Sequence, residues 1–579
     1  MTATVVTTPS GSPSLRYLDE HLEDPVDPWA GARAFVQEEQ LAGVDHVVLF
    51  GGGLGYRAAR LAELGVTPVV FEPCPGVPDL AAGPTTPEAP RFTRLEDLHA
   101  HLLRISRPDQ RTVLLTPPPY RRAFPEAHDR VAEVLDEVQG LVLLRHNSIE
   151  ERSALLAERA LSNLPLLTRV PVIDRLDRPL AGTPAFIVSA GPSLDRNRAR
   201  LREAATVGAV FVVNTAAPAV AAVDAPIDLL VAIEALDVAE PLSMARDQAR
   251  GVALDLTSGG PNFGVPIDPK VTFLADAAQY RALARSLGVG TLAYGGSVAT
   301  AAFALAHRLG ADPVVLVGQD LAYTAGRGYA SDTLYAGTTV RRDGALLVID
   351  RVAKWDETTR AAGLKVPSKV RPAMAVPAWG GGTVDTTHEL TMFRRWFEMA
   401  ARELGRGIRL VNATEGGARI AGFEERPLAD VVASASPRED RLAAAMDRAR
   451  PVDRATVSAA AETIERSADR VAKAAERCRR AKVSAVARAE AQLRAVARDA
   501  PLVEAHAASP LSAIRKRDDL SAEERAEATY AAIRASARRV AELATEARAS
   551  LGPRARRHRA QGRRRRARHP SRKARRSRA

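Results

Sequence analysis

The chain has few residues of the kinds that define disulfide-rich, metal-binding or membrane proteins. Its 579 residues include two cysteines, Cys74 and Cys478, which lie too far apart to form a metal-ligand motif and suggest no disulfide framework. No apolar run approaches the ~18 uninterrupted residues of a membrane span. The first residues also lack the charged-then-apolar layout of a signal peptide. We therefore expect a cytoplasmic protein with reduced thiols.

The net charge of +12 is concentrated at the C-terminal end of the sequence. Fourteen of the 81 basic residues lie at 554–579, where there is no acid, so the rest of the chain, with all 69 acidic residues, has a net charge of −2. This tail has too few apolar residues to pack and is predicted to be disordered. No aromatic residue interleaves its basic residues, so it does not indicate specific nucleic-acid binding.

Removal of this tail should leave the rest of the protein unchanged. Deletion of residues 554–579 is expected to alter neither the melting temperature nor the affinity for nucleotide, because the positive excess is confined to the tail. Thermal unfolding and a nucleotide titration measure the two quantities. A fall in either one would show that the tail folds onto the body.

Length and composition predict a globular protein of about three or four domains. The content of 46% hydrophobic and 26% charged residues is typical of this class. We expect a Rossmann-like N-terminal domain at 1–150, a central α/β domain at 151–425, a helical region at 426–552 and the tail at 553–579. The helical region is rich in Ala, Arg and Glu, and its long helices are expected to break near Pro501 and Pro510.

The N-terminal domain contains a glycine-rich turn between two predicted strands. GGGLGY follows the apolar run at 45–50, and a second run at 68–71 ends at Glu72. This pattern is typical of a βαβ unit in which the acid accepts a ribose hydroxyl. Such a turn is also frequent in α/β domains that bind no ligand there, so both interpretations stay open.

The first strand and turn predicted in the central domain lie in TPAFIVSAGPSLD at residues 183–195. The apolar run at 185–188 predicts a buried strand, and the residues after the turn predict a helix through about residue 205. Gly191 lets backbone approach a ligand, Pro192 presets the helical φ, and Ser193 can cap the helix. Free N–H groups at a helix start favour an anion, so we place the phosphate end of a nucleotide here. The alternative is that these residues only turn and cap.

Polar residues also follow the later strands predicted in this domain. The carboxyl ends of parallel strands share one edge of the sheet, where α/β enzymes bind ligands. A polar residue there either contacts a ligand or closes a turn. In chain order these residues are Asn214, Glu234, Asp237, Gln319, Asp320, Thr414 and Glu415. Before the helix predicted at 298–309, Gly296 forms a turn and Ser297 is a natural N-cap.

Three stretches of this domain together resemble a known family. AFIVSAGPSLD at 185–195, the sequence from YGGSVATAAF to GQDLAYTAGRGYA at 294–330, and LVNATEGGARIAG at 410–422 resemble the motility accessory factor family of bacterial glycosyltransferases. The region at about 163–422 also resembles the domain named after archaeal 6-hydroxymethylpterin diphosphokinase. The order of the three stretches makes the match specific, and it implies a sialyltransferase-like α/β fold.

The resemblance implies a donor, an acceptor and a set of site residues. The family moves a nonulosonic acid, such as pseudaminic or legionaminic acid, from a CMP-activated donor to Ser or Thr of flagellin. Gly191, Pro192 and Ser193 then lie at the phosphate, and Asn214 lies near the ribose or base. Across the nucleotide lie Gly296 and Ser297, followed by Gln319 at the sheet edge.

The chemistry needs a group that accepts the proton of the attacking hydroxyl. Asp320 is the first candidate base and Glu415 the second, and the reaction requires no metal. Two alternatives remain. One is pyrophosphate transfer from ATP to a pterin, with Mg²⁺ held by carboxylates such as Glu234, Asp237 and Asp320, although the sequence has no GxxxxGK loop. The other is a non-enzymatic interaction protein whose tail binds nucleic acid or an anionic membrane.

Overall fold

The computed structural model describes residues 3–77, 84, 89–106, 110–150, 152–350, 368–404, 407–481, 483–515, 517 and 519–552. The basic tail at 553–579, which we expect to be disordered, lies outside these residues. The chain divides into two compact units, Met1–Glu151 with His388–Arg395, and Arg152–Thr387 with Trp396–Ala579. The boundary that we place at 425 lies within the second unit.

The first unit is built on a four-stranded parallel sheet in the order β6-β5-β4-β7. Alternate residues of the inner strand β4 enter two different hydrophobic clusters: Val48 and Phe50 pack in one, and Val47 and Leu49 pack in the other. Both faces of the sheet are therefore buried, as expected for a Rossmann-like domain. The strands are β4 (His46–Phe50), β5 (Val69–Phe71), β6 (Arg91–Phe92) and β7 (Thr112–Leu115).

Helices and a small antiparallel sheet complete this unit. The helices are α1 (Pro28–Phe35), α2 (Tyr56–Glu63), α3 (Leu95–Ile105), α4 (Pro118–Ala123) and α5 (Pro125–Glu150). The small sheet contains β1 (Thr4–Thr7), β2 (Pro13–Tyr17) and β3 (Glu20–His21).

The second unit is built on an eight-stranded sheet in the order β12-β11-β10-β9-β8-β13-β19-β20, in which every pair is parallel. Chain order runs outward from β8 in one direction and from β13 in the other, so the topological switch point lies between these two strands. The strands are β8 (Ala185–Val188), β9 (Ala209–Val213), β10 (Leu229–Ala232), β11 (Val252–Asp255), β12 (Lys270–Phe273), β13 (Val314–Val317), β19 (Leu410–Asn412) and β20 (Glu424–Glu425).

Helices and two hairpin sheets surround this sheet. Val298–Arg308 forms α12, which packs across β8, β9 and β10 and has Ser297 as its N-cap, as expected. Further helices are α6 (Ser153–Asn163), α9 (Ala217–Ala222), α10 (Ala239–Ser243), α11 (Ala278–Leu287), α15 (Leu428–Ala433) and α16 (Arg441–Arg448). Helix α14 (His388–Leu404) is divided between the units after Arg395. The hairpin sheets contain β14 (Thr339–Asp343), β15 (Leu346–Asp350) and β16 (Lys369–Pro372), and β17 (Met374–Pro377) with β18 (Thr383–Thr386).

The single helix expected after Ser193 is wrong. The segment forms a four-residue helix α7 (Leu194–Asn197), a 3₁₀ turn (Arg198–Arg200) and a second helix α8 (Leu201–Val207). The Asn197 side chain donates to the carbonyl groups of Ala413 and Thr414. This contact ties the short first helix to the end of β19.

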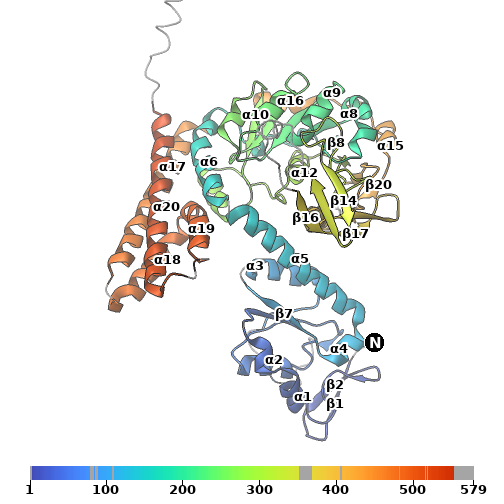
Figure 1. Cartoon of the computed structure of the whole chain (residues 1–579), viewed down its shortest axis with the longest axis vertical. Coiled ribbons are helices and arrows are strands. Elements are labelled where there is room, and N and C mark those ends of the chain that lie inside the picture. Colours follow the sequence, from blue (N-terminus) through green and yellow to red (C-terminus); the bar gives the residue numbers. More distant parts are fainter. Residues whose placement is uncertain are drawn as a thin grey trace, which may run out of the picture. The chain divides into compact units, whose positions relative to one another are not determined.

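Long helices form the C-terminal region, as the composition predicts. They are α17 (Arg454–Arg480), α18 (Val486–Arg498), α19 (Pro501–Arg515) and α20 (Ala522–Ser550), and α17 and α20 lie side by side (Figure 1). Pro501 begins a helix, but the break expected at Pro510 is wrong, because this residue lies inside α19. Packing of α19 on α6 and α20 outweighs the cost of a proline within a helix.

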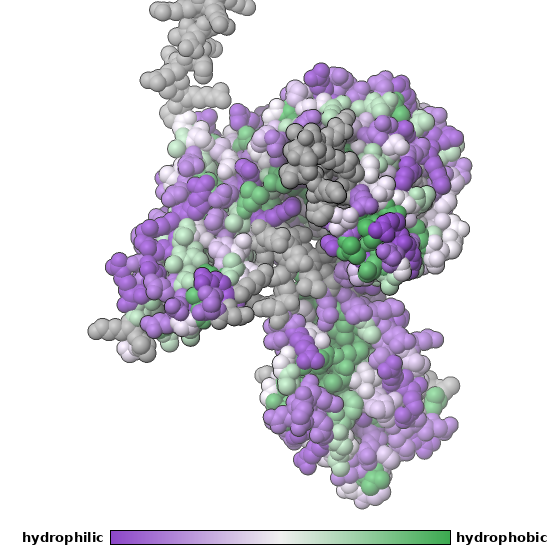
Figure 2. Space-filling view, in the orientation of Figure 1, coloured by the Kyte–Doolittle hydropathy of each residue, from purple (hydrophilic) through white to green (hydrophobic). Residues whose placement is uncertain are grey.

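The surface drawn in Figure 2 is largely hydrophilic. The exposed large hydrophobic residues of the described chain are Val5, Leu18, Val26, Leu236, Met244, Leu346 and Val370. None of the described helices combines the length and the apolarity that a membrane crossing requires.

Candidate functional site

The exits of β8 and β13 meet at the carboxyl edge of the central sheet. The backbone N–H of Gly191 donates to the carbonyl oxygen of Gly318 over 2.8 Å. A Cβ on Gly191 would lie 2.1 Å from Oδ1 of Asp320 and 2.6 Å from that same carbonyl oxygen. Glycine is therefore required here because two loops approach closely. This close approach accounts for the glycine without a ligand.

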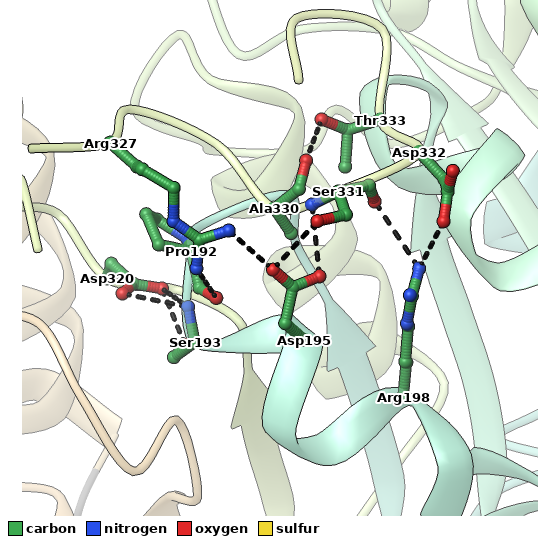
Figure 3. Close-up of polar contacts among 10 residues, drawn as sticks. All are labelled: Pro192, Ser193, Asp195, Arg198, Asp320, Arg327, Ala330, Ser331, Asp332 and Thr333. Carbon is green, nitrogen blue, oxygen red and sulfur yellow. Dashed lines mark hydrogen bonds and ion pairs between the residues drawn. The ribbon is translucent and has the colours of Figure 1, made fainter. Parts of the chain in front are cut away.

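Ser193 does not cap the helix that follows it, so this expectation is wrong. Its hydroxyl donates to Oδ1 of Asp320 over 2.6 Å, and its backbone N–H lies 3.2 and 3.3 Å from the two carboxylate oxygens (Figure 3). Proline at 192 has no N–H. The N–H groups of Gly191 and Ser193, which we expect to be free for an anion, are thus engaged within the protein. Their placement at the phosphate remains a prediction.

Asp320 is a buried carboxyl group, 2% exposed, that joins the two exits. Burial raises its pKa to about 6, against the opposing effects of the hydrogen bonds from Ser193 and the positive charge of Arg196. At neutral pH the group is ionised, and it is poised to accept a proton.

The other predicted base lies against a different element. Oε1 of Glu415 accepts a hydrogen bond of 2.9 Å from the backbone N–H of Leu428, at the start of α15. Its carbonyl oxygen accepts from Arg196, and its φ of +57° is in the left-handed region. Thr414, in contrast, is fully buried and accepts from the backbone N–H of Gln319 over 3.3 Å. Thr414 is therefore bound to the exit of β13 at the switch point. The carboxylate of Glu415 instead accepts a hydrogen bond from the N-terminus of α15.

Three buried polar atoms follow adjacent strands and have no hydrogen-bond partner among the described residues. They are Oγ of Ser189, Oδ1 of Asn214 and Oε1 of Gln319, whose residues are 5%, 2% and 8% exposed. Ser189 directly follows β8, and Asn214 directly follows β9. Gln319 follows Gly318, the first residue after β13. A buried polar group without a partner costs about 1–3 kcal/mol. Because they follow neighbouring strands at the carboxyl edge, we take this edge as the candidate ligand site.

Glu234 extends this edge beyond Asn214. The Asn214 side chain hydrogen-bonds to the Glu234 carboxylate, and burial raises the Glu234 pKa despite this bond. Asp237 is exposed and accepts from the backbone N–H of Ala239 over 2.9 Å. Within the residues that the structure describes, no three His, Cys, Asp or Glu side chains gather as a metal site would require. The carboxylates Glu234, Asp237 and Asp320 are therefore not gathered into one cluster, and their binding of Mg²⁺ together with a nucleotide stays an untested alternative.

The turn predicted before α12 is present. Gly296 has a φ of +83°, and Oγ of Ser297 accepts from the backbone N–H of Thr300 over 3.3 Å. Ser297 is thus committed to capping α12, and its contact with nucleotide remains a prediction.

A segment that sequence reasoning missed crosses this edge of the sheet. Residues 327–334, here called the strap, are held by Asp195 of α7, which accepts from Arg327 over 2.7 Å and from the backbone and hydroxyl of Ser331 over 3.0 and 3.1 Å (Figure 3). Arg198 donates to Asp332 over 2.6 Å. The strap also binds the backbone of both neighbouring exits, through Ala330 N–H to the Ala190 carbonyl and Leu334 N–H to the Thr215 carbonyl. The sequence signal for it is GRG at 326–328, which contains the first two residues of the strap.

The N-terminal glycine loop is filled by side chains of its own unit. A Cβ on Gly51 would lie 2.3 Å from the Tyr120 ring, and one on Gly53 would lie 2.6 Å from Oε1 of Glu23. Glu72 is 1% exposed and accepts from the backbone N–H groups of Gly53 and Cys74 over 2.8 and 3.0 Å. Of the two interpretations, these contacts favour a turn that binds no ligand, because Glu72 binds the glycine loop itself.

Comparisons with known proteins agree with this architecture. Residues 158–326 match the family model described as 6-hydroxymethylpterin diphosphokinase MptE-like. The Maf glycosyltransferase of Magnetospirillum magneticum AMB-1 has a similar solved structure, with a TM-score of 0.54 and 14% sequence identity, over 94% of this chain and 92% of that one. No curated protein matches the sequence. The chain thus carries an MptE-like domain at residues 158–326 and has the fold of the Maf glycosyltransferase, as the sequence resemblance implies.

Proposed function

We propose that this protein is a glycosyltransferase that moves a nonulosonic acid from a CMP-activated donor to Ser or Thr residues of flagellin. The fold shared with a Maf glycosyltransferase supports this proposal. The reaction would take place in the cytoplasm. In sheets of this topology ligands bind outside the carboxyl ends of the strands at the switch point, which here lies between β8 and β13.

The observation that carries the proposal is the group of unpartnered acceptors at this switch point. Oδ1 of Asn214 and Oε1 of Gln319 are buried oxygens that need hydrogen-bond donors. The ribose hydroxyls and the exocyclic amino group of cytosine are such donors. A cytidine nucleotide at the carboxyl edge would satisfy both oxygens.

Asp320 is the proposed base, and Glu415 is the second candidate. The sugar centre reacts through an oxocarbenium-like state while CMP leaves, so the protein needs only to accept the proton of the attacking hydroxyl. A pKa of about 6 suits Asp320 for this task at neutral pH. Because the Ser193 hydroxyl now occupies Oδ1, it would have to rotate away or give way to the acceptor hydroxyl.

The diphosphokinase alternative is supported by the description of the matching family model. It would need Mg²⁺, and its candidate carboxylates lie apart: Asp320 accepts from Ser193, while Asp237 accepts from the start of α10. An interaction protein that acts through its basic tail is a further alternative, and a binding assay at low and high salt with and without residues 554–579 isolates it.

Calorimetry of the purified protein with CMP, CTP and ATP, each with and without Mg²⁺, distinguishes the two enzymatic functions. We expect CMP to bind without Mg²⁺, because the unpartnered acceptors at the switch point require no metal. Binding of ATP but of neither CMP nor CTP, and only in the presence of Mg²⁺, would contradict the proposal and favour pyrophosphate transfer.

A further inference from the structure

The turn at residues 191–193 offers few donors of its own to an anion. The N–H of Gly191 is bound to Gly318, and that of Ser193 is bound to Asp320. Pro192 has none. An anion placed at this turn therefore needs positive charge from a side chain.

Arg327 is the strap residue whose side chain reaches this turn. Its Nη2 lies 3.4 Å from the carbonyl oxygen of Pro192, and its Nη1 lies 2.7 Å from Oδ2 of Asp195 (Figure 3). The side chain is 40% exposed, so a ligand can contact it. A guanidinium has five N–H donors in a planar fork that matches phosphate oxygens. Among the described residues only those two acceptors engage it, and the remaining donors can bind a ligand.

The carboxylate of Asp195 holds the guanidinium of Arg327 in place. Burial alone would raise the pKa of Asp195, but the hydrogen bonds from Arg327 and Ser331 together hold it below its usual range. The carboxylate is therefore ionised, and it fixes Arg327 before any ligand arrives. The other arginine beside the turn, Arg196, donates to the Glu415 carbonyl and so lies toward the end of β19.

We propose that Arg327 binds the phosphoryl group of the nucleotide at the β8 turn, with Asp195 as its positioning residue. This inference rests on the proposed function and names the group that recognises the anion of the CMP donor. It also gives the strap a role, because the segment that crosses the switch point delivers the cation. The carboxylate of the nonulosonic acid is the donor's other anion, and the test below separates it from the phosphate.

The ratio of CMP affinity to cytidine affinity tests the inference, because these ligands differ only in the phosphate. In Arg327→Ala we expect CMP affinity to fall at least about tenfold, the loss typical of charge-assisted hydrogen bonds, while cytidine affinity stays within twofold of wild type. Arg327→Lys should retain part of the preference for CMP. Arg198→Ala is the matched control, since it removes another arginine that binds the strap without contacting the turn, and it should preserve the ratio.

Asp195→Asn should lower CMP affinity and leave cytidine affinity unchanged. A general loss of structure at the site would instead lower the affinity for both ligands. An Arg327→Ala protein that retains the wild-type ratio of CMP affinity to cytidine affinity would overturn the inference. If the KM for the CMP-sugar donor also rose in that protein, Arg327 would bind the sugar carboxylate and not the phosphate. If wild type binds ATP instead of CMP, the proposed function fails, and the ATP-to-adenosine ratio tests Arg327 in the same way. Binding of neither nucleotide would overturn both proposals.

Discussion

Asp320→Asn should bind CMP with near wild-type affinity and transfer sugar at least about a hundredfold more slowly. Asparagine keeps the size of the side chain and one acceptor oxygen for Ser193, so the joint between β8 and β13 is preserved. It cannot take the proton of the attacking hydroxyl. Steady-state kinetics with calorimetry of CMP binding separate these two effects.

The pH dependence gives a second readout of the same residue. With a pKa of about 6, Asp320 loses its charge as the pH falls through that value, so wild-type turnover should decline below about pH 6. The residual activity of Asp320→Asn should lack this decline. Asp268→Asn, which changes an exposed carboxylate just before β12, is the control and should behave as wild type. Near-normal turnover of Asp320→Asn would move the base to Glu415.

Gly191→Ala should destabilise the second unit by about 3 kcal/mol, as expected for overpacking at a rigid joint. The added Cβ would lie 2.1 Å from Oδ1 of Asp320 and 2.6 Å from the Gly318 carbonyl oxygen, and the second of these atoms is backbone. Thermal unfolding measures the effect. The same overlap means that weaker CMP binding by any larger residue at position 191 would follow from the altered joint and would not identify the phosphate.

Gly264→Ala is the matched control, because nothing lies within 4 Å of a Cβ at that position. Its stability should stay within about 0.5 kcal/mol of wild type. Equal melting temperatures of Gly191→Ala and wild type would contradict the close approach of the two exits.

The parts of the fold that the sequence predicts are those with local signals. The runs that become β8 and β13 are apolar throughout, and each is followed within three residues by a glycine, so both the strands and their exits are predictable. The sequence does not reveal β11 and β12, because each contains a charged residue and lies in a segment of mixed composition. The helix predicted through about residue 205 fails at Asn197, whose side chain binds the distant exit of β19.

The site depends on pairs that no local pattern reveals. Ser193 has the sequence of an N-cap, but its hydroxyl binds Asp320, 127 positions away. Arg327 and Asp195 are separated by 132 positions. Each residue alone is typical of a solvated loop or helix, so only the fold shows that the strap brings a cation to the β8 turn.

The transfer of sugar to a protein is the central claim, and mass spectrometry of flagellin tests it most directly. Purified protein is incubated with flagellin and, in separate reactions, CMP-activated pseudaminic, legionaminic and N-acetylneuraminic acids. We predict that at least one donor adds its nonulosonic acid to Ser or Thr of flagellin with equimolar release of CMP, and that Asp320→Asn does so at least about a hundredfold more slowly. Unmodified flagellin with all three donors, together with Mg²⁺-dependent transfer of pyrophosphate from ATP to a pterin, would contradict it.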